Sequence, residues 1–290
     1  MYIKAFKATI ASKHTERAYQ TDLQLFKSMT SAPLPEVDRG AVQSFLSTLQ
    51  DRGEASSTIR RRLSALRSFY KWMRDEGHCT HNPTRDVQFS APSSDSSDRP
   101  LTADDLKHLL ASVAGTTKRD ARARALILIT IYGALRRGPL AALDVENVRP
   151  LVRQWVVDLT SGRGRGGYVS IPASAVDAVE NVKNAFSIEE GPLWRSLSNR
   201  SRGERLSADA LYKIVRRSGE EAGLEPSVTI DRLRTAGLQL ALAGGARPED
   251  VRAHSRLQHP RSIANHFSPE ASPAGLRREV PALIEDQLTT

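Results

Sequence analysis

The stretch Ser227-Val-Thr-Ile-Asp-Arg-Leu-Arg-Thr-Ala-Gly237, followed by Leu257-Gln-His259 and Asn265-His-Phe-Ser-Pro269, carries the strongest indications of architecture in this chain. It places Asp231, Arg234 and His259 in order along the sequence. A leucine- and alanine-rich run between them, ended by two glycines, predicts a short apolar helix, and a second helix is predicted from Pro248 to His254. The polar residues therefore fall at helix ends, where side chains from several elements can converge on a ligand.

A further arginine box precedes this stretch. A long apolar helix is predicted from Asp120, and it ends in Gly133-Ala-Leu-Arg136. The apolar neighbours predict that Arg136 lies at a junction between buried helices, where a guanidinium is costly unless it meets an anion. A structural salt bridge would satisfy that requirement. We favour phosphate binding, because Arg136 and Arg234 then form a pair.

A basic hairpin and a basic helix lie between the two boxes. Residues 155–159 and 168–172 are predicted to be paired strands, and the connection Ser161-Gly-Arg-Gly-Arg-Gly-Gly167 is glycine-rich and basic. The helix predicted from Ser207 to Gly219 presents further cations, while its Tyr212 is expected to face the core or a groove. The residues of this region expected to bind DNA are Arg165, Lys213, Arg216 and Arg217.

The first part of the chain is predicted to be a small helical bundle. Helices are expected from Ser12, from Arg39 to Gln50, and after a cap formed by Ser56-Ser-Thr58. The third helix carries a basic face that suits DNA phosphates, although such a face is also common on a solvated helix. Its candidate DNA-binding residues are Arg60, Arg61, Arg62, Arg67 and Lys71. We expect domains at 1–88 and 101–290, joined by a Ser-, Asp- and Pro-rich linker at 89–100.

Composition supports a nucleic-acid partner. The 290 residues include 42 Lys plus Arg against 33 Asp plus Glu, a net charge of +9, and only 6% aromatic residues. The excess of positive charge suits double-stranded DNA, and the low aromatic content disfavours a stacking platform for single strands. Cys79 is the only cysteine, so disulfides and cysteine zinc sites within the chain are excluded. We expect no metal, no cofactor, no membrane attachment and a cytoplasmic location.

These motifs resemble those of the tyrosine recombinases of the phage integrase family. The likeness rests on Ala134-Leu-Arg136, on Asp231-x-x-Arg234 and on Leu257-Gln-His259, and it extends from about Ser12 to Phe267. It implies a mainly α fold with a small β-hairpin or sheet. An N-terminal helical core-binding domain would precede a mixed α/β catalytic domain.

The resemblance also implies a reaction at a DNA phosphodiester. In the family, a tyrosine attacks the phosphorus, two arginines stabilise the growing charge, and a hairpin lysine protonates the leaving hydroxyl. The corresponding catalytic positions here are Arg136, Arg163, Asp231, Arg234, His259 and Phe267.

Three of these positions depart from the family pattern. Arg163 replaces the lysine, and a guanidinium, whose pKa lies far above neutral pH, is a poor proton donor. Asp231 replaces a histidine, and its carboxylate repels phosphate unless it is protonated or paired, for example with Arg232 or Arg261. Phe267 lies one residue before the usual tyrosine spacing, and Ser268 lies at that spacing.

Three functions remain open on these grounds. The first is a DNA-binding pseudoenzyme that acts as an accessory or architectural subunit in DNA recombination, DNA integration or mobile-element transfer, associated on DNA with itself or with related recombinases. The second is an active recombinase that uses Ser268, with His266 as its base, or a tyrosine of a partner protomer. The third is a helical scaffold for another protein. The amphipathic tail from Leu276 is expected either to dock on a neighbouring protomer or to pack on its own domain.

Overall fold

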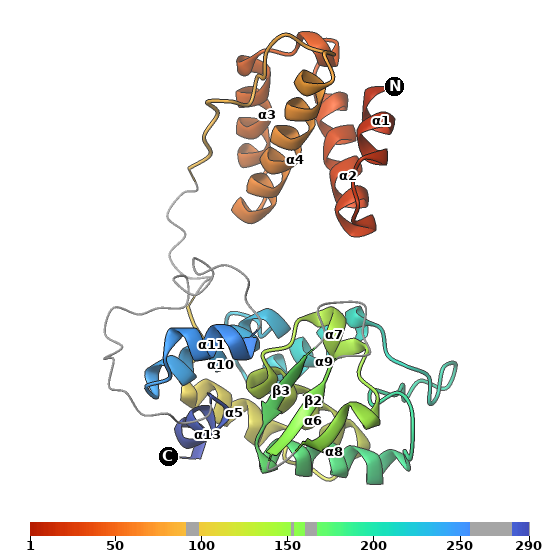
Figure 1. The fold of residues 1–290 in the computed structure, drawn as a ribbon, viewed down its shortest axis with the longest axis vertical. Coiled ribbons are helices and arrows are strands. Elements are labelled where there is room, and N and C mark those ends of the chain that lie inside the picture. The colour runs from red at the N-terminus through yellow and green to blue at the C-terminus, as the bar shows by residue number, and fades with distance from the viewer. Residues whose placement is uncertain (91–98, 152–153, 160–166, 256–279, 290) are drawn as a thin grey trace. The chain divides into compact units, whose positions relative to one another are not determined.

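The computed structural model describes residues 1–90, 99–151, 154–159, 167–255 and 280–289. Contacts divide the chain into two compact units, Met1–Asp95 and Ser96–Thr290. The first is helical, and the second combines helices with one small antiparallel sheet (Figure 1). The predicted fold class is therefore confirmed. The linker at 89–100 stays a prediction, because residues 91–98 lie outside the described part.

The N-terminal unit is built from α1 (Tyr2–Ala8), α2 (Lys13–Met29), the 3-10 turn η1 (Leu34–Glu36), α3 (Arg39–Asp51) and α4 (Ser56–Asp75) (Figure 1). Aromatic rings form its core. Phe26 lies edge-on to Phe45 at 5.0 Å and to Tyr70 at 6.4 Å between ring centroids. The Tyr70 hydroxyl donates to the Leu34 carbonyl at 3.2 Å, so this buried polar group is satisfied.

The helix starts differ in how they are capped. The helix expected from Ser12 is α2, and the Ser12 side chain caps it by accepting from the backbone of Thr15. The predicted Ser56–Thr58 cap is wrong: α4 already begins at Ser56, and its N-cap is Ala55, which makes no side-chain cap bond. The extended backbone of Ala55 lets its carbonyl accept from Thr58 and Ile59, so the first turn closes without a side-chain cap. Helix α1 was not predicted, since seven residues show too little periodicity.

The C-terminal unit is organised around α6 (Lys118–Gly133), which is buried along most of its length. Helix α6 contacts α8 (Ala173–Phe186), α9 (Ala208–Glu221) and α10 (Ile230–Ala243). Helix α5 (Ala103–Ser112) precedes it and begins with a capping box formed by Thr102 and Asp105. A second capping box, formed by Thr117 and Asp120, starts α6 two residues before the predicted position.

Glycine allows α10 to approach α6 closely. A Cβ at Gly237 would lie 2.2 Å from the carbonyl oxygen of Ile131, which is far inside van der Waals contact. Only a residue without a side chain fits at this crossing. The distance between the two helices is therefore set by Gly237, one helical turn after Arg234.

The sheet has three strands in the order β1 (Val148–Leu151), β2 (Gln154–Asp158) and β3 (Tyr168–Ile171), all antiparallel. The predicted pair is confirmed as β2 and β3, with Val157 opposite Val169. Strand β1 was not predicted, because it is short and contains Pro150, which supplies no amide donor. Figure 1 shows β3 beside α6, in agreement with their contacts.

The chain ends in α11 (Pro248–Ser255) and α13 (Val280–Thr289). Helix α13 packs on its own unit: it contacts α5, α6, α10 and α11, and its Leu283 and Ile284 are buried. The Ser174 hydroxyl donates to the Glu285 carboxylate at 2.6 Å. Of the two expectations for the tail, packing on its own domain is the one found in this structure. No helix in the described ranges is long and apolar enough to cross a membrane.

Candidate functional site

Arg136 projects outward from a sharp turn at the end of α6. Ala134 adopts the left-handed conformation, with φ 46° and ψ 36°, and Arg136 then serves as the N-cap of α7 (Arg137–Ala141). Leu135 turns into the core and Arg136 turns to the surface. Arg136 therefore lies at a junction between two helices, as predicted, but its side chain is exposed and not buried between them. Within the described residues Arg136 forms neither an ion pair nor a side-chain hydrogen bond.

The buried arginine of the pair is Arg234, on α10. Its side chain is 8% exposed, and its Nε–H donates to the Ala134 carbonyl at 2.8 Å. This bond spans 100 residues of sequence and joins the two predicted arginine boxes. A guanidinium beside the carboxyl end of α6 is also favoured by the helix dipole. Arg234 therefore holds the turn that presents Arg136.

His254, which sequence reasoning did not single out as a site residue, supports the same helix end. From α11, its Nε2 lies 2.6 Å from the Tyr132 carbonyl, and because a carbonyl only accepts, this nitrogen carries the proton in the contact. Only Gly133 lies between Tyr132 and Ala134, so side chains from α10 and α11 both bind the end of α6. No sequence pattern pairs His254 with Tyr132; its only signal was a histidine in the last turn of a short helix.

Asp231 lies exposed in the first turn of α10, where a carboxylate is favoured by the helix dipole. The suggested pairing with Arg232 is wrong. The Arg232 guanidinium instead donates to the main-chain carbonyls of Pro226, Ser227 at 2.8 Å, and Arg99 at 2.6 Å. It therefore fixes the loop before α10, while the Asp231 carboxylate faces solvent.

Four predicted site residues cannot be placed beside these groups. Arg163, Arg165, His259 and Phe267 lie outside the described residues, as do Arg261, His266 and Ser268. Their assigned roles stay predictions. No group of three or more His, Cys, Asp or Glu side chains suited to a metal occurs among the residues that the structure describes.

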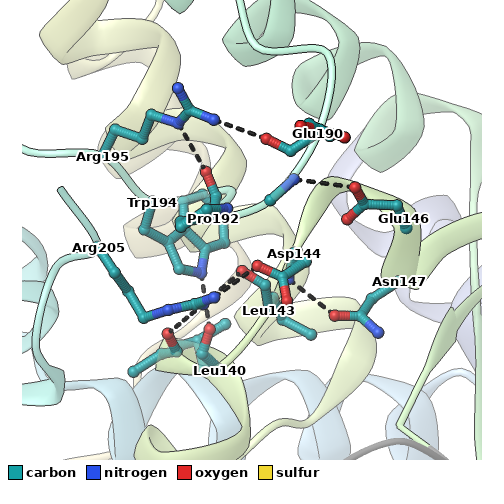
Figure 2. A network of polar contacts seen from close by, with 12 residues as sticks. Leu140, Leu143, Asp144, Glu146, Asn147, Glu190, Pro192, Trp194, Arg195 and Arg205 are labelled. Atoms are coloured by element: carbon teal, nitrogen blue, oxygen red, sulfur yellow. Dashed lines mark hydrogen bonds and ion pairs between the residues drawn. The ribbon is translucent and has the colours of Figure 1, made fainter. Parts of the chain in front are cut away.

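A network of polar contacts holds the end of α7 and the residues that follow it (Figure 2). The indole N–H of buried Trp194 donates to the Leu140 carbonyl at 2.7 Å. Arg205 donates to the Leu143 carbonyl at 3.1 Å and pairs with the Asp144 carboxylate at 2.5 Å. These contacts satisfy carbonyls at the end of α7, whose first residue follows Arg136. The segment before α9 thus holds the helix that begins directly after Arg136.

Replacing Arg205 by methionine is expected to lower the free energy of unfolding by about 1–2 kcal/mol, because the Leu143 carbonyl and the Asp144 carboxylate lose a charged donor. Urea denaturation followed by tryptophan fluorescence measures the change. Arg202→Met is the matched control: Arg202 lies in the same segment, is exposed, and makes only a 3.4 Å contact with Asn199. Equal midpoints for the two variants would contradict the anchoring role of Arg205.

The predicted DNA-binding cations of α9 differ in their surroundings. Arg216 pairs with Glu220 at 2.9 Å and Arg217 with Glu221 at 2.6 Å, whereas Lys213 is exposed and has no ion pair with any described residue. Tyr212 packs beneath the Arg137 guanidinium, 5.2 Å from its ring centroid, so it faces α7. Arg137 also pairs with Asp209, which joins α7 to the start of α9.

The candidate DNA-binding cations of α4 also differ in whether they are already paired within the unit. Arg61 and Arg62 both reach Asp22, which is 2% exposed, and Arg62 also pairs with Glu54 at 2.7 Å. Burial raises the pKa of the Asp22 carboxyl, and the two guanidinium groups oppose that rise. Arg67 donates to the Val87 carbonyl at 2.6 Å. Arg60 and Lys71 are exposed and form no ion pair in the described part of the unit, so they are the cations most available to a ligand.

Comparison with known proteins agrees with this architecture. Residues 2–77 match the phage integrase N-terminal SAM-like domain, and residues 99–258 match the phage integrase family. A tyrosine recombinase of Synechococcus elongatus is 30% identical, with 85% of this chain and 83% of the relative covered. Tyrosine recombinase XerC of Thermodesulfovibrio yellowstonii is 26% identical, covering 81% and 79%. The chain belongs to the phage integrase family of tyrosine recombinases.

A solved structure shows the same fold. A lambda integrase dimer bound to a COC′ core site superposes with a TM-score of 0.72 at 16% identity, and the match covers 96% of this chain and 94% of that one. The likeness includes both units of the chain.

Proposed function

We propose that this protein binds duplex DNA and takes part in site-specific recombination or integration as an accessory or architectural subunit that does not itself cut DNA. It would act in the cytoplasm, associated with itself or with related recombinases. The observation that carries the binding function is the exposed Arg136, which is held by the buried Arg234 on the turn after α6. Family membership supplies the class of reaction to which such an arginine belongs.

The chemistry of the site favours a phosphate ligand. An exposed guanidinium without an internal carboxylate partner is available for bidentate contacts with phosphate oxygens. A rigid turn adds to this, because a fixed donor loses little entropy when it binds. The net charge of +9 attracts a polyanion over a longer range, and Arg60 and Lys71 provide further exposed cations.

We propose that the protein does not cleave DNA because of the residues that stand where the family has its nucleophile. Phe267 and Ser268 occupy the region where the family has its tyrosine, and phenylalanine has no oxygen to attack phosphorus. Two described tyrosines of this unit, Tyr132 and Tyr212, are poor substitutes. Burial raises the pKa of Tyr132 to about 12, and Tyr212 packs under Arg137. Asp231 and Arg163, at positions of the histidine and lysine, further weaken the expected chemistry.

Duplex binding is tested by fluorescence anisotropy with a labelled DNA that contains the sequence flanking the gene. If six or more phosphates are contacted, the affinity should fall about 10³-fold or more between 50 and 200 mM salt. The helical-scaffold alternative predicts no such salt-dependent binding. Failure to bind duplex at low salt would overturn the proposal.

Cleavage is tested separately with a nicked suicide duplex and a denaturing gel. We expect a complex in the native gel and no covalent adduct in the denaturing gel. An adduct that disappears in Ser268→Ala would instead establish a serine nucleophile. An adduct formed only when a related recombinase is added, and attached to that recombinase, would support the accessory role.

A further inference from the structure

A basic cavity lies at the opposite end of α6 from Arg136. It has a volume of about 260 Å³, and its lining includes Val113, Arg119, Arg122, Lys213, Ile214 and Arg217. These residues come from the end of α5, the start of α6 and one face of α9. Arg122 and Gly133 are 11 positions apart on α6, which corresponds to about 17 Å along the helix axis. The cavity is therefore separate from the turn that carries Arg136.

The cavity has an excess of positive charge. Two carboxylates also line it, but both are already engaged: Glu221 pairs with Arg217 at 2.6 Å, and Asp120 accepts from Thr117 in the capping box of α6. Arg119 and Lys213 are exposed and form no ion pair with any residue in the described ranges. Together with Arg122, they leave three positive charges without a carboxylate partner around one cavity.

Arg122 is the unusual member of this group. It is 7% exposed, and its Nη1 donates to the Arg195 carbonyl at 2.6 Å. Its Nε is buried and has no acceptor among the described residues. Burial lowers the pKa of the guanidinium, and the nearby charge of Arg119 lowers it further. A buried cation beside a second cation, with no carboxylate paired to it among the described residues, is costly, and a bound anion would offset that cost.

The apolar part of the lining narrows the class of ligand. Val113, Ala123 and Ile214 face the same cavity as the cations. Free phosphate is much smaller than this space and would leave the apolar wall in contact with water. A phosphate group joined to an organic moiety would satisfy both parts of the lining, because pockets for small molecules combine apolar walls with a few placed polar groups.

We propose that this cavity binds a small phosphorylated molecule of nucleotide size. Its phosphate lies between Arg119, Arg122 and Lys213, and its organic part packs on Val113 and Ile214. The ligand joins the start of α6 to the second half of α9, and it binds at the same time as duplex DNA because the cavity is separate from Arg136.

Calorimetric titration of the full chain with AMP tests this assignment, with adenosine and inorganic phosphate as partial ligands. We expect AMP to bind, adenosine not to bind, and inorganic phosphate to bind more weakly than AMP. Lys213→Gln and Arg119→Gln change exposed side chains, so folding should be preserved, and each should weaken AMP binding at least about tenfold, the loss of one charge-assisted contact. Arg200→Gln, an exposed arginine of the same unit outside the cavity, should leave binding unchanged.

The proposal would be overturned if AMP did not bind. It would also be overturned if wild type, Lys213→Gln and Arg119→Gln bound AMP equally. A third contradicting result is competitive displacement of AMP by a short duplex, which would make the cavity part of the DNA-binding surface. Simultaneous binding of AMP and duplex, with AMP binding lost only in the cavity variants, would support it. Because AMP binding is measured without DNA, failure of this site leaves the proposed DNA function intact.

Discussion

Replacing Gly237 by alanine is expected to lower the free energy of unfolding of the C-terminal unit by about 3 kcal/mol, at the upper end of the usual range for overpacked cores. The new methyl carbon would lie 2.2 Å from the carbonyl oxygen of Ile131 and 3.0 Å from its carbonyl carbon. Both are backbone atoms of the central helix, so no side-chain rotation can relieve the clash. Helices α6 and α10 must move apart, and the bond from Arg234 to Ala134 should weaken with them.

Urea denaturation followed by tryptophan fluorescence measures this effect, since Trp194 is buried in the same unit. Gly138→Ala is the matched control. Gly138 is an exposed residue of α7, and a Cβ there would meet nothing within 4 Å. Alanine at this position should leave stability unchanged or raise it by about 0.5–1 kcal/mol through its better helix propensity. If both glycine variants unfold at the wild-type midpoint, close approach of α10 does not fix the position of Arg234.

The sequence predicted the elements whose signal is local. Apolar spacing indicated α2, α3, α4 and α6, and alternation with a glycine-rich connection indicated the β2–β3 pair. The boxes around Arg136 and Arg234 were visible because the residue types and their order matched those of a known family. Elements with weak local signals, such as α1 and β1, were missed.

Contacts between distant residues were beyond such reasoning. The apolar run before Arg136 suggested burial, but the left-handed turn at Ala134 places this side chain outside and leaves Arg234 inside. Periodicity cannot reveal a single residue with positive φ. The bond of His254 to α6 and the network of Trp194 around α7 also depend on tertiary packing. The surroundings of Arg122 were equally invisible, because three elements meet there.

Arg136 is proposed to bind phosphate and Arg234 to hold the turn that carries it, so replacing each by methionine should have different consequences. Arg234→Met should lower the free energy of unfolding by about 2–3 kcal/mol, because the buried Ala134 carbonyl loses a charged donor. It should also weaken duplex binding, since the turn that carries Arg136 loses its support. Arg136→Met should leave the unfolding midpoint unchanged, because that side chain is exposed and unpaired among the described residues. Its duplex affinity should fall roughly tenfold, with the salt dependence reduced by about one phosphate contact.

Measuring both variants for stability and for duplex affinity separates positioning from contact. A third variant, Arg200→Met, removes an exposed arginine of the same unit and corrects for the loss of one positive charge. Wild-type affinity in Arg136→Met would show that this arginine does not touch DNA, whatever its exposure. Full stability in Arg234→Met would show that the Ala134 turn holds without it. Only a loss of affinity in both variants, with a loss of stability in Arg234→Met alone, fits a site in which one arginine binds phosphate and the other holds it in place.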